Sequence, residues 1–395
     1  MPQSLEYLRV LDLSRVLAGP YCAMVLADLG ADVIKVELPG TGDDARAYGP
    51  FIKGESAYYM SINRNKRGIT LNLKHPEGRA VFLRLARWAD VVIENYRPGT
   101  MERLGLGYAD LEKENPRLIY AAVSGFGATG PYRHRPAYDI IAQGMGGLMS
   151  ITGHPGGPPT RVGASVGDII AGLYTAVGIL AAVNERTRSG HGQFIDVSMM
   201  DCQVSILENA ISRYLATGQV PRPLGNHHPS ITPFSTFKTA DGYIIIAAGN
   251  NEVFGRLCGV LGVPELAADP RFSTNPARTQ NRDALAAALE VAMAGAGTDH
   301  WLAVLEAGGV PAAPVQTVDQ VIRDPQVQAR DMVAEIDHPV AGRTKIPGVP
   351  VKMSRTQGWV RRPAPTLGQH NEEILTQVLG LSEDQVEELR AKGVL

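Results

Sequence analysis

Two aspartates that stand just before apolar helical stretches are the first residues with evident chemistry. Asp168 follows Val166-Gly167 and precedes an apolar run, and Asp139 follows Tyr138 in a similar setting. An aspartate at such a position usually accepts hydrogen bonds from the free N–H groups of the helix's first turn. The same N-terminus stabilises a carboxylate anion, the form that attacks carbonyl carbons in covalent catalysis. For each of these two aspartates, the sequence therefore allows two alternative roles, as a helix cap or as a nucleophile.

Two short motifs near these aspartates suggest other chemistry. Residues 163–167 match the GxSxG pattern of hydrolases, with Ser165 as the nucleophile. That pattern needs an apolar strand before the serine, and the preceding stretch is rich in glycine and proline instead. Residues 125–130 match GxGxxG, but Pro131 follows where a dinucleotide site needs a helix. A serine hydrolase stays an alternative, and a nicotinamide site is not expected.

Basic side chains gather at the ends of expected strands or in the loops that follow them. In an open parallel sheet, ligands bind outside the carboxyl ends of the strands, and arginine and lysine there suit phosphate groups. We therefore expect a compact site for a phosphorylated ligand. The residues concerned are the run 63–68 with Lys74, Arg97, Arg103, Arg133 and Arg135.

The composition is that of a globular protein, and it limits the classes of partner. Of 395 residues, 44% are apolar and 20% are charged, and 38 Lys and Arg balance 40 Asp and Glu. A net charge of −2 excludes the broad basic surface of a nucleic-acid-binding protein. The three scattered cysteines predict reduced thiols without disulfides or structural zinc, and no motif predicts another metal.

The same reading predicts a cytoplasmic protein without a membrane partner. The N-terminal residues show no basic segment followed by an apolar one, so no secretory signal is expected. The longest apolar run, 169–183, is shorter than the roughly 20 residues that a membrane span needs. That run predicts a buried helix.

Alternating strand and helix patterns predict a parallel α/β domain, because strand–helix–strand units at this spacing wind right-handed. The expected strands are 8–13, 31–37, 68–73, 90–96 and 118–127, and the expected helices are 20–30, 76–89 and 199–218. A hairpin at 235–250 and helices at 252–262, 280–295 and 299–308 predict a second, smaller domain. We expect domain limits of 1–220, 221–330 and 331–395, the last segment returning to the large domain and ending in a helix at 381–393.

Segments along nearly the whole chain resemble the class III CoA-transferases, the family of formyl-CoA and carnitine CoA-transferases and 2-methylacyl-CoA racemases. The resemblance lies, in order and spacing, in 10–20, 29–37, 63–74, 94–108, 138–153, 166–182, 189–201 and 367–375. The stretch 225–250 is most similar to the branch that uses succinyl-CoA and dicarboxylate acceptors, such as the glutarate enzyme.

The resemblance implies a role for particular residues. Asp168 matches the family's nucleophile, and an acyl-CoA is a substrate, with no cofactor bound permanently. The positions that match CoA contacts are Val16, Leu17, Ala18, Leu71, Asn72, Leu73, Lys74, Asn95, Tyr96, Arg97, Arg103, Arg135 and Tyr138. Candidates for binding the acid, or for excluding water and donating N–H groups, are Arg46, Gly146 within the run 144–147, Gly225, Asn226, His227 and His228.

The implied architecture is a Rossmann-like large domain built from both chain ends, a smaller α+β domain, and an interlocked homodimer of ring-shaped subunits. The expected reaction moves CoA from succinyl-CoA to a carboxylic acid, for which a dicarboxylic acid is expected, through a covalent aspartyl anhydride and an aspartyl-CoA thioester. Every nucleophile in this scheme is expected to be an anion near neutral pH without a base.

The sequence departs from the family pattern at three places. The racemases carry a histidine where Tyr138 stands, so the base for racemisation is missing, and racemase activity is kept as an alternative only. Formyl-CoA transferases carry glutamine and arginine where Leu17 and Leu38 stand, which argues against oxalate. Their glycine-rich lid corresponds to 225–229, where His227 and His228 are candidates for holding an acceptor carboxylate.

Overall fold

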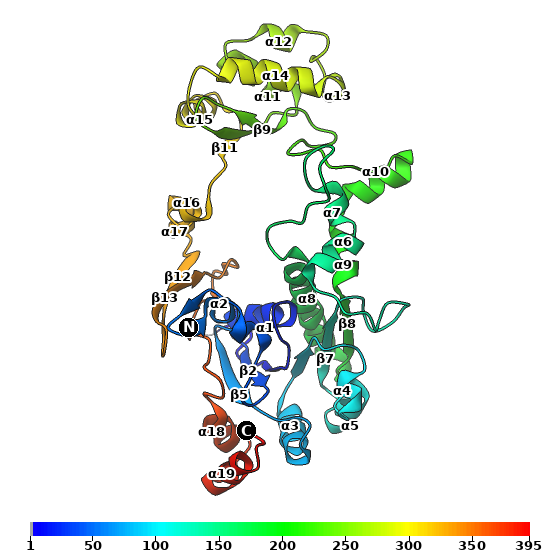
Figure 1. Cartoon of the computed structure of the whole chain (residues 1–395), viewed down its shortest axis with the longest axis vertical. Helices are drawn as coiled ribbons and strands as arrows, with labels where there is room; N and C mark the ends of the chain where they lie inside the picture. The colour runs from blue at the N-terminus through cyan, green and yellow to red at the C-terminus, as the bar shows by residue number, and fades with distance from the viewer. Residues whose placement is uncertain (1–2) are drawn as a thin grey trace. The chain divides into compact units, whose positions relative to one another are not determined.

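The computed structural model describes residues 3–395, and contacts within the chain divide it into two units (Figure 1). Unit 1 holds the chain up to Leu148, together with Arg161–Ala216 and Pro325–Leu395. Unit 2 holds Met149–Thr160 and Thr217–Asp324. The sequence-based limits of the small domain were 221–330, whereas unit 2 also takes in the short segment before Arg161.

Unit 1 is built on a six-stranded sheet in the order β5-β2-β1-β6-β7-β8, and all neighbouring strands are parallel. This is the order of doubly wound folds, in which the winding reverses between the first and fourth strands, here β1 and β6. The predicted parallel α/β fold is confirmed. The strands are β1 (Arg9–Asp12), β2 (Asp32–Glu37), β5 (Lys66–Thr70), β6 (Val91–Glu94), β7 (Ile119–Ser124) and β8 (Phe194–Ser198).

Helices cover both faces of the sheet because side chains alternate along each strand. Val10 and Val33 face a core shared with α1 and α8, whereas Leu11 and Ile34 face a core shared with α3, α5 and the C-terminal α19. Both chain ends therefore contribute to one domain. These helices are α1 (Ala18–Asp28), α3 (Pro76–Trp88), α5 (Tyr108–Glu114), α8 (Val166–Ser189) and α19 (Glu383–Ala391).

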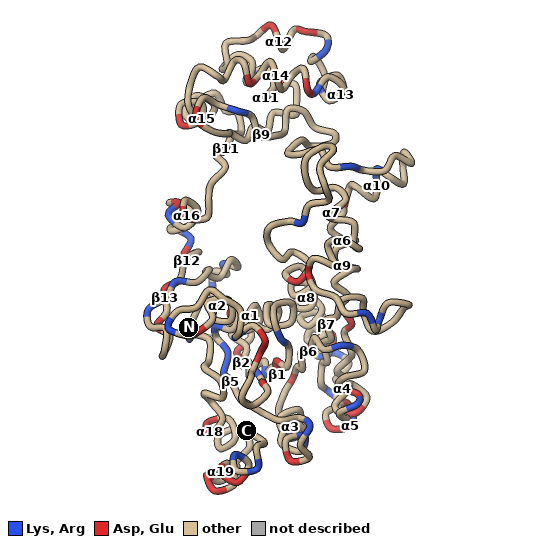
Figure 2. The backbone as a smooth tube through the Cα atoms, in the orientation of Figure 1, with Lys and Arg blue, Asp and Glu red and all other residues tan. Residues whose placement is uncertain are grey.

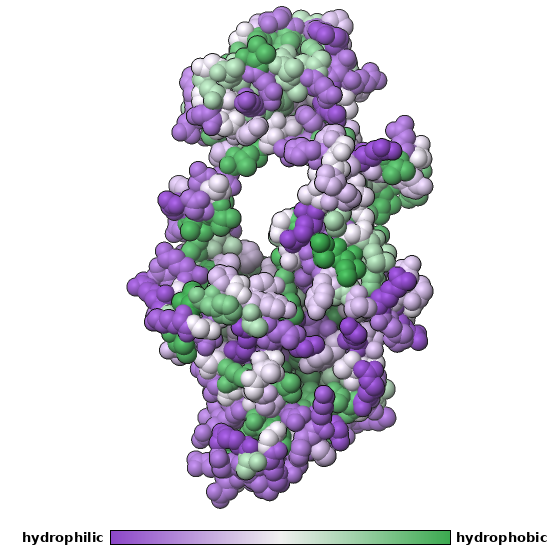
Figure 3. All heavy atoms as spheres, in the orientation of Figure 1, coloured by the Kyte–Doolittle hydropathy of each residue, from purple (hydrophilic) through white to green (hydrophobic). Residues whose placement is uncertain are grey.

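The helix α8 is longer than the apolar run that predicted it. With 24 residues, α8 is long and apolar enough to cross a membrane by length and composition. The shortness of the apolar run 169–183 is therefore no argument against a membrane-spanning helix. However, α8 packs against α1, β7 and β8, the position of a core helix in a soluble α/β domain. On the face drawn in Figure 3, apolar and polar residues are interspersed over this unit.

Most predicted elements of unit 1 are present with small shifts, and two differ. Strand β8 was not predicted, and the helix expected over 199–218 is two helices separated at Glu208, whose φ is 42°. The remaining elements of unit 1 are η1 (Asp44–Ala47), β3 (Phe51–Ile52), β4 (Glu55–Ser56), α2 (Ala57–Ile62), α4 (Thr100–Arg103), α6 (Asp139–Met145), α9 (Met199–Ile206), α10 (Asn209–Thr217), α17 (Pro325–Ala329), β12 (Val333–His338), β13 (Gly342–Pro347), α18 (Asn371–Glu373) and η2 (Ile374–Val378). The short helix α7 (Leu148–Ile151) begins at the end of a unit 1 segment.

Unit 2 is a small antiparallel sheet, β11-β10-β9, packed against helices. Phe237 and Ile244 on the sheet contact Phe254, Leu285 and Trp301 on the helices in one buried cluster. The predicted hairpin and the three predicted helices are present. The elements are β9 (Phe234–Lys238), β10 (Tyr243–Ala247), α11 (Asn251–Val260), α12 (Glu265–Ala268), α13 (Asn275–Gln280), α14 (Arg282–Met293), α15 (Thr298–Ala307), β11 (Ala312–Pro314) and α16 (Val318–Val321).

Charged residues of both signs are mixed along the chain (Figure 2). The expectation about a broad basic surface rests on the net charge of the whole chain. The arginines that concern the site are those that line one cavity in unit 1.

Candidate active site

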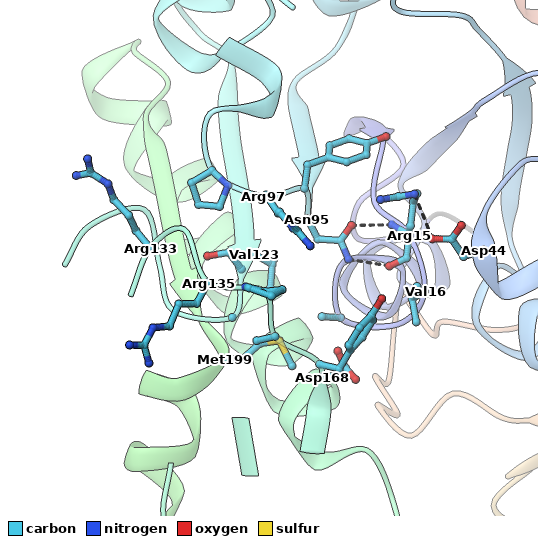
Figure 4. A pocket seen from close by; sticks show the side chains of 18 residues that line it. Arg15, Val16, Asp44, Asn95, Arg97, Val123, Arg133, Arg135, Asp168 and Met199 are labelled. Carbon is cyan, nitrogen blue, oxygen red and sulfur yellow. Dashed lines mark hydrogen bonds and ion pairs between the residues drawn. The ribbon is translucent and has the colours of Figure 1, made fainter. Parts of the chain in front are cut away.

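A cavity of about 210 Å³ lies at the carboxyl ends of the central strands of unit 1 (Figure 4). Val16 follows β1, Asn95 follows β6, Ser124 ends β7 and Met199 follows β8, and all four residues line it. The cavity therefore lies where the winding of the sheet reverses, the usual place for a ligand in a doubly wound fold. Asp168, from the first turn of α8, lines the same cavity.

The side chain of Asp168 is not a helix cap. It is partly buried and accepts no hydrogen bond from residues 3–395, and the only charged group that affects it markedly is Asp139. A carboxylate that is not engaged by the protein is available to react with a ligand. The catalytic role that the sequence left open for Asp168 is the one that this geometry allows.

Asp139 has the capping role instead, although it caps a helix other than its own. Its Oδ1 accepts the N–H of Gly167 in the first turn of α8 at 2.8 Å. Its Oδ2 accepts the side-chain amide of Gln143 at 2.8 Å and lies 3.4 Å from the Arg161 guanidinium. Asp139 is therefore held in place as a structural carboxylate, and its charge acts on Asp168.

The surroundings of Asp168 change its protonation. Burial, and secondly the negative charge of Asp139, raise the pKa of Asp168 from 3.8 to about 7. A pKa near 7 means that Asp168 titrates close to neutral pH instead of near pH 4. The expectation that the nucleophile is an anion without a base therefore depends on pH, and the residue belongs among the strongly shifted groups that are typical of active sites.

Four arginines give this cavity a positive wall. Arg15, Arg97, Arg133 and Arg135 line it, and Arg135 also lies over the ring of Tyr132, at 4.1 Å. Guanidinium groups bind phosphate and carboxylate oxygens in pairs. The cavity can therefore hold an anionic ligand whose reactive carbon lies near Asp168.

A second cavity, of about 390 Å³, adjoins the first. Both are lined by Arg15, Asp44 and Tyr96, and Arg15 bridges to Asp44 at 3.1 Å. The second cavity contains four consecutive predicted CoA-binding positions, Leu71–Lys74. Together the two cavities offer room for an extended ligand.

Most predicted CoA-binding residues line one of these cavities. Val16, Ala18, Asn95, Tyr96, Arg97, Arg135 and Tyr138 line the first, and Leu71, Asn72, Leu73 and Lys74 line the second. Leu17 is instead buried in a cluster with Met24 and Ile62. Arg103, in α4, donates to Thr100 and is not among the lining residues of either cavity.

The predicted acid-binding residues of unit 1 have other partners. Arg46 donates to Glu37 at 2.7 and 2.8 Å and to the Tyr59 hydroxyl at 2.7 Å, so its guanidinium is committed within the protein. A Cβ at Gly146 would lie 2.3 Å from the Cβ of Gln203, so glycine there permits α6 to approach α9. Acid binding by either residue stays a prediction.

The remaining predicted acid-binding residues belong to unit 2. Asn226 donates to Thr236 at 2.7 Å, and His228 lies edge-on against Phe234. Burial, and secondly the positive charge of Arg282, lower the pKa of His227, which favours the neutral imidazole. A neutral His227 can donate one hydrogen bond to a carboxylate but cannot form an ion pair with it. The roles of Gly225, Asn226, His227 and His228 stay predictions.

The structure also adds residues that the sequence analysis missed. Arg15 lines both cavities, and its place in the stretch 10–20, directly before the predicted contact Val16, is the signal that could have marked it. Burial, and secondly the charge of Asp168, raise the pKa of Tyr58 to about 12, so its phenol keeps its proton at neutral pH. Only the folded chain brings these residues to Asp168.

Ser165 lacks the setting of a hydrolase nucleophile. It stands at the start of α8, and the residues before it, 157–164, form no strand. The GxGxxG stretch likewise precedes no helix until α6. Neither motif stands in the structural setting that its chemistry requires.

Comparison with known proteins decides the family. The model of the protein family described as "CoA-transferase family III" matches residues 5–371 of this chain. The chain belongs to this family. Succinyl-CoA:glutarate CoA-transferase of Mus musculus is 43% identical over 392 residues, which cover 99% of this chain and 90% of the relative. Acetyl-CoA:oxalate CoA-transferase of Acetobacter aceti is 48% identical over 362 residues, 91% of this chain and 92% of the relative.

A solved structure supports the same assignment. The crystal structure of a CAIB/BAIF family protein from Brucella suis matches with a TM-score of 0.86 at 43% identity, covering 96% of this chain and all of that one. For a CoA-transferase of family III, the adjoining cavities at the switch point of the sheet are the candidate site for a CoA thioester.

Proposed function

We propose that this CoA-transferase moves CoA from an acyl-CoA, with succinyl-CoA as the first candidate, to a dicarboxylic acid through covalent intermediates on Asp168. The observation that supports this proposal most directly is the unengaged carboxylate of Asp168 in a cavity lined by four arginines. A carboxylate without hydrogen bonds in a partly desolvated site is a stronger nucleophile than one in water.

In the first half of the proposed reaction, Asp168 takes up the CoA group. One Asp168 oxygen attacks the donor's thioester carbonyl, the C–S bond breaks, and CoA leaves as a thiolate from a mixed anhydride. The thiolate then attacks the aspartyl carbonyl of that anhydride. The donor acid leaves as a carboxylate, and an aspartyl-CoA thioester remains.

In the second half, the acceptor carboxylate repeats these steps in reverse order. It attacks the aspartyl-CoA carbonyl, forms a new anhydride and releases the thiolate. The thiolate attacks the acceptor's acyl carbon, which regenerates the Asp168 carboxylate and releases the new CoA ester. No proton is gained or lost over the cycle, so only the starting carboxylate must be ionised.

The protein must keep water away from the anhydrides and stabilise each tetrahedral oxyanion. We assign the first task to closure around the bound CoA ester. The run 144–147 was the sequence-based candidate for the second task, but the N–H groups of Gly146 and Gly147 donate to the carbonyls of Ala142 and Gly144 at 2.8 and 3.3 Å and are not free to do so. Arg97, Arg133 and Arg135 of the positive wall suit the phosphates of CoA, whereas Arg15 is paired with Asp44. The cavity that contains Leu71–Lys74 suits the rest of the nucleotide end of CoA.

The acceptor is expected to be a small dicarboxylic acid. Relatives at more than 40% identity are named for glutarate and for oxalate, and one is named for acetyl-CoA as donor. Leu17 and Leu38 argue against oxalate, but the oxalate relative is similar enough for this acid to belong in any test. Glutarate is the first candidate acceptor.

A direct test incubates the protein with succinyl-CoA or acetyl-CoA and a panel of acids, and identifies the products by mass. Transfer to one of the acids, with hydroxylamine sensitivity after addition of acyl-CoA, supports the proposal. Release of free CoA without an acceptor, together with labelling of Ser165 by a fluorophosphonate, would instead indicate a hydrolase. Exchange of the α-proton of a 2-methylacyl-CoA in D₂O would indicate a racemase.

We further propose that the protein is an interlocked homodimer in the cytoplasm. Leu173, Tyr174 and Val177 of α8 are 39%, 44% and 62% exposed in the single chain, although α8 is otherwise a core helix. A second copy would cover such a face. Cys22, Cys202 and Cys258 are all buried and unpaired, which suits a reducing compartment.

A further inference from the structure

The turn that follows β1 carries the backbone strain of this site. Val16 has a φ of 66°, in the left-handed region that β-branched residues rarely adopt. Its carbonyl accepts no hydrogen bond from residues 3–395, because Pro20, four residues later, has no N–H to donate. Such strain persists only where surrounding contacts impose it, and it is concentrated at functional sites. Val16 lines the cavity that holds Asp168.

The first contact that imposes this conformation comes from Asn95. Its Oδ1 accepts the N–H of Arg15 at 2.7 Å, and its Nδ2 donates to the carbonyl of Arg15 at 2.7 Å (Figure 4). Both polar ends of the side chain are thus used on the residue before Val16. Asn95 follows β6, so this contact joins the two strands between which the winding of the sheet reverses.

The second contact comes from a buried ion pair. Asp43 Oδ1 accepts the N–H of Val16 at 2.9 Å, and Asp43 Oδ2 lies 2.8 Å from the Lys35 ammonium. Lys35 also donates to the carbonyl of Ser14 at 2.8 Å. The Lys35 and Asp43 side chains are completely buried. Because a buried ion pair seldom adds net stability, its effect here is to fix the geometry of the residues it contacts.

We propose that Asn95 and the Lys35–Asp43 pair are positioning residues, which together hold the Arg15–Val16 turn in the strained conformation that accepts the CoA ester beside Asp168. This inference rests on the proposed function and deepens it. It assigns to Asn95 a role through the backbone of Arg15 rather than a contact between its own amide and CoA.

The test replaces Asn95 and then relieves the strain at Val16. Asn95→Ala is expected to weaken the binding of free CoA, measured by calorimetry, by about tenfold or more, and to raise KM more than it lowers kcat. Adding Val16→Gly to Asn95→Ala is expected to restore most of the affinity, because glycine adopts a φ of 66° without strain. Lys35→Met with Asp43→Leu, which removes the second contact without leaving a buried charge, is expected to weaken CoA binding in the same way.

Asn115→Ala is the matched control. Asn115 also donates to two backbone carbonyls, those of Ala86 and Ala89, but lines neither cavity. It is expected to lower Tm as Asn95→Ala does while leaving the Kd for CoA unchanged. Equal loss of CoA affinity in the control would overturn the proposal by showing a general effect of stability.

Two other outcomes would also overturn it. If Val16→Gly restores nothing, Asn95 contacts CoA directly. If Asn95→Ala binds CoA as the unaltered protein does, the turn needs no such contact, although the proposed transfer would stand. A protein that neither binds CoA nor transfers it would overturn the proposed function itself, and this inference with it.

Discussion

Asp139 caps the helix that carries Asp168. Its Oδ1 accepts the N–H of Gly167 at 2.8 Å, and its charge helps to raise the pKa of Asp168. One carboxylate thus takes the hydrogen bond that the helix terminus offers, and the other stays unengaged in the cavity. The two aspartates look alike in the sequence, but the fold gives them different tasks.

This arrangement predicts a pH dependence of transfer. The carboxylate form of Asp168 is the proposed nucleophile, so kcat/KM should fall as the pH falls through about 7. Asp139→Asn keeps an oxygen for the N–H of Gly167 and removes the negative charge. The pKa of Asp168 should then decrease, and the acidic limb of the kcat/KM profile should move to lower pH. The limb should stay well above 3.8, because burial is the larger cause of the shift. A limb that stays in place or moves to higher pH would contradict this account.

Replacement of Asp168 should remove activity while stabilising the fold. Asp168→Asn is expected to reduce transfer by at least about a thousandfold, the scale seen when a covalent nucleophile is removed. In the folded protein the pKa of Asp168 is raised, so ionisation at high pH costs stability. This cost is absent below the unfolded value near 3.8 and complete above about 7. Its upper bound is about 4 kcal/mol, and solvent screening of a partly exposed group lowers it.

Thermal unfolding at two pH values measures this cost. The Tm advantage of Asp168→Asn over the unaltered protein should grow from pH 5 to pH 8. Asp139→Asn serves as the comparison, because it weakens contacts with Gln143 and Arg161 and should lower Tm. An Asp168→Asn protein that is less stable at pH 8 would mean that this carboxylate is structural.

The sequence predicts those parts of the fold that depend on neighbours along the chain. The apolar strands β1, β2, β6 and β7 were recognisable from their composition, and the position of Asp168 before an apolar helix was recognisable too. Strand β8 was missed because it lies at the edge of the sheet and is only partly buried.

The contacts of the site depend on residues far apart in the sequence, and these were not predictable. The hydrogen bond between Asp139 and Gly167 joins positions 28 residues apart, and the bonds between Asn95 and Arg15 span 80. The left-handed backbone at Val16 runs against the preference of valine, so no local rule indicates it. For the same reason Arg46 was a candidate for acid binding, although Glu37 and Tyr59 occupy its guanidinium.

The exposed face of α8 predicts how the proposed dimer can be separated. The side chain of Val177 on α8 is 62% exposed, and that of Leu173, about one turn earlier on the same helix, is 39% exposed. Val177→Arg would place a charge in the expected interface and should yield a monomer by light scattering, with an unchanged far-UV circular dichroism spectrum. Val291→Arg is the control, since Val291 is 78% exposed on α14 in unit 2 and should leave the oligomeric state unchanged. A Val177→Arg protein that elutes like the unaltered one would exclude this face as the interface.

Gly172 sets the distance between the two helices that form the site. It lies one turn after Asp168, and a Cβ there would lie 2.6 Å from the carbonyl of Ala18 and 3.2 Å from the Cβ of Tyr21. Gly172→Ala must therefore push α1 away from α8, which separates Val16 and Ala18 from Asp168. Crowding of this kind costs about 1–3 kcal/mol, so both Tm and kcat/KM should fall. In Gly255→Ala, by contrast, the new methyl group on α11 meets no atom within 4 Å, so stability should rise by about 0.5–1 kcal/mol with transfer unchanged. If Gly172→Ala lowered Tm but left kcat/KM intact, the close contact of α1 and α8 would serve stability only.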